Sequence, residues 1–182
     1  MLWVTLGLLT LLSVLVIIIY NQLVQSRQLV ENGWSDIEVQ LKRRADLIPR
    51  LVDSVKGYAG HERKLFSEVI EKRNAALAAG DRPNARASAE GALQKPVGRL
   101  IALAEDYPEL KASGNFLDLQ NELSETEDKI EMSRRFYNGA VRSLNTKIES
   151  VPSNFVAGPF GFKKRDYFVI DNSYYAAPKV DL

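Results

Sequence analysis

The chain has 182 residues, and its 24 basic and 23 acidic side chains leave almost no net charge. This balance argues against a general nucleic-acid-binding protein, which usually carries a basic excess or a basic stripe. The absence of cysteine excludes disulfides, thiolate catalysis and cysteine-ligated zinc.

An uncharged apolar run occupies Leu2 to Ile19. At about 1.5 Å per residue, a helix of this length covers roughly 27 Å, close to the hydrocarbon thickness of a bilayer. Aromatic rings near both ends favour the membrane interface. We therefore predict a transmembrane anchor over residues 1–20. Its predicted transmembrane residues include Leu2, Trp3, Val4, Leu8, Leu12, Leu15, Ile18, Ile19 and Tyr20.

A cleaved signal peptide is the alternative for this segment. No basic residue precedes the run, and no pair of small residues follows Tyr20 at the spacing of a cleavage site. We therefore favour an uncleaved, single-pass anchor. Arg27 is the first basic residue after it, which gives a weak preference for a cytoplasmic C-terminal body.

Residues 21–150 are predicted to form long helices that pack lengthwise on one another, and the anchor is expected to continue into the first of them. Apolar residues recur there every seven positions, at Trp34, Leu41, Ile48 and Val55. Arg44 interrupts the adjoining row, and Pro49 predicts a kink near residues 45–49. Gly57 and Gly60 separate this helix from a second, residues 80–83 separate the second from a third, and Pro108 ends the third.

A long last helix is predicted from an N-cap at Asn115 to Pro152. Its heptad row is Phe116, Leu123, Ile130, Tyr137 and Leu144. The adjoining row contains small and polar residues, which favours close packing against helices of the same chain or of another copy.

Residues 151–182 form an aromatic C-terminal arm. Its aromatic residues are Phe155, Phe160, Phe162, Tyr167, Phe168, Tyr174 and Tyr175. The arm either packs its rings on the bundle or bridges subunits of an oligomer. We predict a short strand over residues 167–170.

Several segments resemble the bacterial LemA family. They read WSDIEVQLKRR (34–44), DLIPRLV (46–52), VKGYA (55–59), HE (61–62), YPELKAS (107–113), NF (115–116), LQNEL (119–123), TEDKI (126–130) and RFYN (135–138). The resemblance implies a short anchor in the bacterial inner membrane followed by an antiparallel helical bundle, with no settled biochemical activity. A relative acts in magnetosome membranes, which suggests a role in membrane organisation. Arg50 and residues 80–96 depart from the family pattern, so no role is carried onto them.

Catalytic and metal-binding patterns are missing from the sequence. His61 is the only histidine, and Leu65 stands where a metalloprotease helix would place its second ligand. We therefore predict no catalytic residue, no metal site, no cofactor and no enzymatic activity.

Acidic residues gather on the predicted last helix, at Glu122, Glu125, Glu127, Asp128 and Glu131. We interpret them as a solvated face that pairs with the basic run at residues 42–44, rather than as a cation site. A lipid-headgroup patch is the alternative for that basic run.

The sequence therefore predicts a non-enzymatic, membrane-anchored scaffold that self-assembles as a homo-oligomer. The alternative is a tethered adaptor for another membrane or signalling protein, and a hydrolase with an unrecognised site is a remote third hypothesis.

Overall fold

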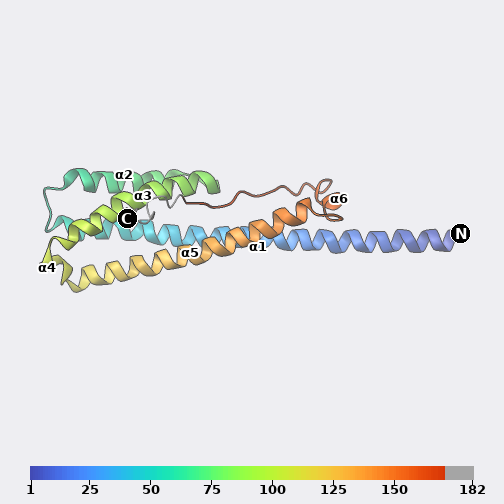
Figure 1. Cartoon of the computed structure of the whole chain (residues 1–182), viewed down its shortest axis with the longest axis horizontal. Coiled ribbons are helices and arrows are strands. Elements are labelled where there is room, and N and C mark those ends of the chain that lie inside the picture. The colour runs from blue at the N-terminus through green and yellow to red at the C-terminus, as the bar shows by residue number, and fades with distance from the viewer. Residues whose placement is uncertain (171–182) are drawn as a thin grey trace, which may run out of the picture. The chain divides into compact units, whose positions relative to one another are not determined.

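The computed structural model describes residues 1–170, which contain six helices and no strand (Figure 1). The predicted all-α fold is therefore confirmed. The helices are α1 (Leu2–Lys56), α2 (Arg63–Ala78), α3 (Pro83–Glu105), α4 (Pro108–Lys111), α5 (Gly114–Glu149) and α6 (Asn154–Ala157).

The chain divides into two compact units, to which α1 and α5 both contribute. We call residues 1–37 with 133–167 the anchor unit, and residues 38–132 with 168–170 the core unit.

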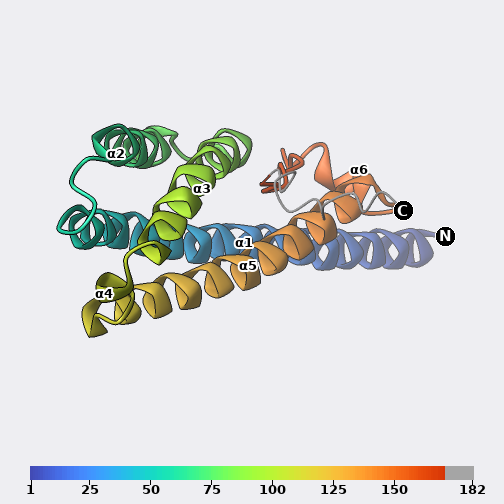
Figure 2. The ribbon, with the colours of Figure 1, turned by 60° about the vertical axis from the view of Figure 1, so that its left-hand side comes forward.

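In the anchor unit, α1 and α5 run antiparallel and lie side by side (Figure 2). Ser26 of α1 contacts Lys147 of α5, whereas Gly33, further along α1, lies against Tyr137. A Cβ atom at Gly33 would stand 3.1 Å from the Cα atom of Tyr137, so glycine permits this close approach of the two backbones.

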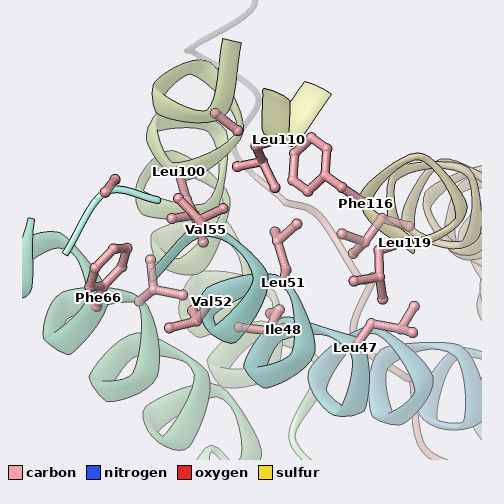
Figure 3. Close-up of a cluster of buried hydrophobic side chains, with 14 of the residues drawn as sticks. Leu47, Ile48, Leu51, Val52, Val55, Phe66, Leu100, Leu110, Phe116 and Leu119 are labelled. Atoms are coloured by element: carbon pink, nitrogen blue, oxygen red, sulfur yellow. The ribbon is translucent and has the colours of Figure 1, made fainter. Parts of the chain in front are cut away.

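In the core unit, five helices surround one hydrophobic cluster (Figure 3). Helix α1 supplies Leu51 and Val55, and the other helices each add apolar residues. Full burial of a leucine or phenylalanine contributes about 1.5–3 kcal/mol, so this cluster is the main source of stability in the unit. Its members on the other four helices include Phe66 from α2, Leu100 from α3, Leu110 from α4 and Phe116 from α5.

Helix α1 continues without interruption through Pro49. Proline has no amide hydrogen to donate to the carbonyl oxygen of Ala45, four residues earlier. The Nε–H group of Arg73, on α2, donates to that oxygen instead, at 2.7 Å. A side chain from a neighbouring helix therefore satisfies the carbonyl that Pro49 leaves free.

Two local predictions are wrong. Residues 167–170 form no strand, because no neighbouring strand offers hydrogen bonds, and Phe168 is instead buried in the core unit. Asn115 is not the N-cap of α5. The helix begins at Gly114, and the amides of Phe116 and Leu117 donate to the carbonyl of Ser113, an equally suitable capping residue.

Candidate functional site

The predicted anchor is exposed along almost its whole length. Helix α1 is the one helix among the described residues that is long and apolar enough to cross a membrane. Its mean hydropathy over the best 18-residue window is 2.7, and only 6% of that window is buried. Leu2, Trp3, Val4, Leu8, Leu12, Leu15, Ile18 and Tyr20 are all exposed. An apolar surface of this length that is almost entirely exposed fits a membrane anchor.

The packed part of α1 begins at the end of the apolar run. Ile19 and Leu23 are buried, and they share a helix face with Ser26 and Val30. Ile19 thus differs from the other predicted transmembrane residues named above, because its side chain is buried against protein. The body of the anchor unit therefore extends back to the end of the predicted span.

Aromatic residues of the C-terminal arm surround Tyr20. The ring centroids of Tyr20 and Phe160 are 5.0 Å apart, and those of Tyr20 and Phe162 are 5.7 Å apart. The Arg27 guanidinium lies 5.5 Å from the Phe162 ring centroid, a cation–π distance. Phe162 is buried, whereas Phe155, Phe160 and Tyr167 are exposed. The first part of the arm therefore packs on its own chain, while Tyr174 and Tyr175 lie outside the described residues.

Hydrogen bonds fix the arm along α5. The Tyr137 hydroxyl donates to the Asp166 carbonyl at 2.8 Å. The Asn145 amide donates to the Arg165 carbonyl and accepts from the Arg165 amide, at 3.0 and 2.9 Å. Burial raises the pKa of Tyr137 to about 12, and the nearby positive charge of Arg165 opposes that rise only in part. A side-chain amide that pairs with both backbone groups of one residue holds the arm in one register.

The heptad rows lie mostly inside the chain. Only Trp34 is partly exposed, and its ring lies 5.5 Å from that of Tyr137. The side chains of these rows are already buried by packing within the chain, so a role of the rows in self-association stays a prediction. The buried members are Leu41, Ile48, Val55, Phe116, Leu123, Ile130, Tyr137 and Leu144.

A buried charge cluster forms around Arg44 in the core unit. Its guanidinium pairs with Glu90 of α3 and donates to Glu127 of α5 at 2.7 Å. Arg86 donates to Glu90 from one turn earlier, at 3.0 Å. Burial by itself lowers the pKa of Arg44, but the two carboxylates outweigh burial and raise it above the usual value.

The predicted pairing of the basic run with the acidic face is confirmed at Arg44 and Glu127. Sequence reasoning missed Glu90, which is 2% exposed. A signal for it exists, because Glu90 occupies an otherwise apolar face of α3, with Ala87 and Leu93 at a spacing of three. Opposite charges that each interrupt an apolar row are candidates for a buried pair.

The other predicted polar residues do not gather into a site. Across residues 1–170, no three His, Asp or Glu side chains lie close enough to hold a metal ion. Lys129 pairs with Glu125 at 2.5 Å, and hydrogen bonding to Lys129 lowers the pKa of Glu125. His61 is exposed in the turn between α1 and α2.

A sequence profile of the LemA family matches residues 33–182. The chain belongs to the LemA family. Its curated relatives include the magnetosome protein MamQ 2 of Paramagnetospirillum magneticum, 28% identical over 82% of this chain. They also include MamQ of Magnetospirillum gryphiswaldense, 25% identical over 82% of the chain, and protein LemA of Metamycoplasma hominis, 29% identical over 75%.

The LemA-family chain spans only 64%, 64% and 63% of the length of these three relatives, in the same order. Neither the family nor its MamQ members are known as enzymes. Family membership and the exposed apolar helix together fit a membrane-associated protein.

Proposed function

We propose that this LemA-family chain is a non-enzymatic helical scaffold, held by α1 in the bacterial inner membrane with its body on the cytoplasmic side. The observation that carries the proposal is the exposed apolar start of α1, which runs without a break into a packed helical body. An anchor that is continuous with a folded helical segment suits a protein that positions others at a membrane. The magnetosome relatives, named for a membrane compartment, add support for a role in organising membrane.

Self-association requires a surface that the fold leaves uncovered. The buried heptad rows are not available for it, but other apolar side chains are. Val39 on α1 and Met132 on α5 each expose 62% of their surface, and both belong to the core unit. We propose that these two side chains take part in the contact between copies, because burial of exposed apolar surface favours association.

The first test is the mass of full-length protein in detergent and in nanodiscs over a range of concentrations. We expect a discrete assembly larger than a monomer. Met132→Lys should reduce the mass toward that of the monomer, because a charge then enters the apolar contact. Ser124→Lys is the matched control, since Ser124 is an exposed residue of the same helix in the core unit and the added charge is equal. A strict monomer at every concentration would remove the scaffold hypothesis.

One observation favours a second candidate function, that of a tethered adaptor. An open groove lies between α1 and α2 in the core unit, with Pro49, Val52, Phe66 and Ile70 among its lining residues and Lys56 and Glu71 at its polar positions. A helix of a partner protein would fit an open, partly apolar groove of this kind. A monomeric protein that loses a partner on Ile70→Asp, while Met132→Lys retains it, would favour the adaptor.

A further inference from the structure

The segment between α5 and the rest of the arm has an apolar exposed face. We call residues 151–162, which include α6, the α6 loop. It contains no charged residue, and Lys163, Lys164 and Arg165 follow it directly. Val151 and Phe155 are each 72% exposed, and Phe160 is 57% exposed.

The α6 loop is packed in place rather than extended into solvent. Val156, Ala157 and Phe162 are buried. The Phe162 amide donates to the Ala157 carbonyl at 3.0 Å, which closes the loop on itself. The buried residues hold the loop in place, and Val151, Phe155 and Phe160 therefore lie on its solvent-exposed side. Three large apolar side chains on a well-packed uncharged loop need an apolar environment.

The position of the loop indicates which environment that is. The Phe160 ring packs on Tyr20, the residue that directly follows the apolar run of α1. The exposed span and the exposed face of the loop therefore meet at the level where α1 is expected to leave the hydrocarbon. Aromatic side chains are enriched at this level of a membrane, and basic residues beside it face anionic headgroups.

We propose that the α6 loop is a second membrane contact, which inserts Val151, Phe155 and Phe160 into the interfacial layer of the bilayer. This inference rests on the proposed anchoring of α1 and deepens it. Helix α1 alone fixes the depth of the protein but leaves it free to tilt. A loop that enters the same leaflet beside α1 limits that tilt and sets the height of the anchor unit above the lipid.

Lipid quenching of single-cysteine variants tests the proposal, because the natural chain has no cysteine. Full-length Phe155→Cys carries an environment-sensitive fluorophore in vesicles of phosphatidylcholine and phosphatidylglycerol with spin-labelled lipids. Leu12→Cys reports on the anchor. Phe136→Cys is the matched control, since Phe136 is 50% exposed and packs beside Gly33, roughly 20 Å beyond Tyr20 along α1.

We expect lipids labelled near the headgroup to quench the Phe155 label at least threefold more than the Phe136 label, and lipids labelled deep in the chain to quench the Leu12 label. Strong quenching at Leu12 with none at Phe155 would overturn the loop contact and leave the anchor intact. No quenching at Leu12 would overturn the anchor. A Phe155 label shielded from aqueous iodide but not quenched by lipid would show that protein covers the loop, and would also overturn the contact. Val151→Cys repeats the measurement at a second exposed position.

Discussion

The charge cluster around Arg44 places two opposite charges in the interior of the core unit. The side chains of Arg44 and Glu90 are 3% and 2% exposed, so each ion is stabilised almost entirely by the other and by Arg86 and Glu127. Removal of one partner from a buried ion pair leaves an uncompensated charge, which costs more than the pair contributes when intact.

Glu90→Ala should therefore lower the free energy of unfolding by about 3–5 kcal/mol, because Arg44 and Arg86 lose their shared carboxylate. Urea denaturation in detergent, followed by circular dichroism, measures the change. Glu122→Ala is the control: its pair with Arg50 spans 3.8 Å between exposed side chains, and its loss should cost about 1 kcal/mol or less. Equal losses for the two variants would contradict the burial argument.

Tyr137 makes the stability of the anchor unit sensitive to alkaline pH. Its pKa is raised to about 12 in the folded protein, whereas an unfolded tyrosine titrates near about 10. The unfolded chain therefore loses its proton first. The contribution of protonated Tyr137 to the free energy of unfolding is complete below about pH 10 and is lost as the pH rises from about 10 to 12.

Absorbance titration of tyrosinate should show at least one of the seven tyrosines ionising late. Tyr137→Phe should abolish that late phase and cost roughly 1 kcal/mol, because the hydrogen bond to the Asp166 carbonyl is lost. Tyr58→Phe changes an exposed tyrosine and serves as the control. Persistence of the late phase in Tyr137→Phe would show that another tyrosine produces it.

At the scale of elements, Pro49 and Arg73 act as a pair. Arg73→Met should lower the free energy of unfolding by about 1.5–3 kcal/mol, because it leaves the Ala45 carbonyl without a donor. In a Pro49→Ala background the restored amide can bond that carbonyl within the helix, so the same change should cost less. The difference between the two backgrounds in a double-mutant cycle measures the coupling. Additive effects would contradict the coupling and would assign the effect of Arg73 to its other contacts, with Asp46 at 3.8 Å and Asn74 at 3.1 Å.

The helices could be predicted from the sequence because their signals are local. Glycine and proline mark helix boundaries by backbone chemistry alone. Gly57 directly follows α1, Gly60 lies in the connection between α1 and α2, Gly80 lies two residues after α2, and Pro108 begins α4. Heptad spacing identifies residues that share a face of α5 without any knowledge of the partner helix.

Pairing between elements could not be predicted in the same way. The sequence indicated that Arg44 would meet acidic residues of the last helix, but Glu90 lies 46 positions away on a different helix, α3. The 167–170 segment has the composition of a strand, yet a strand requires a neighbour, and helix packing decided its conformation. Tertiary contacts thus determined what local propensity left open.

At the scale of the whole molecule, helix α1 consists of two successive segments with different surroundings. Residues 2–18 are exposed or partly exposed, whereas Ile19, Leu23 and Val30 are buried. The same helix thus passes from a segment suited to lipid to a segment that forms the protein interior. The boundary between the two is sharp enough to be tested by truncation.

Deletion of residues 2–18 should release the protein from membranes without unfolding its body. These residues contribute no fully buried side chain, so the free energy of unfolding in detergent should change by about 0.5 kcal/mol or less. Alkaline carbonate extraction and urea denaturation measure the two effects. Deletion of residues 2–24 is the matched control: it removes the same span and also Ile19 and Leu23, and truncation of a buried leucine alone costs about 2–5 kcal/mol. If the shorter deletion destabilised the body as much as the longer one, the span would be part of the fold. If the shortened chain stayed in the membrane after carbonate treatment, α1 would not be its principal anchor.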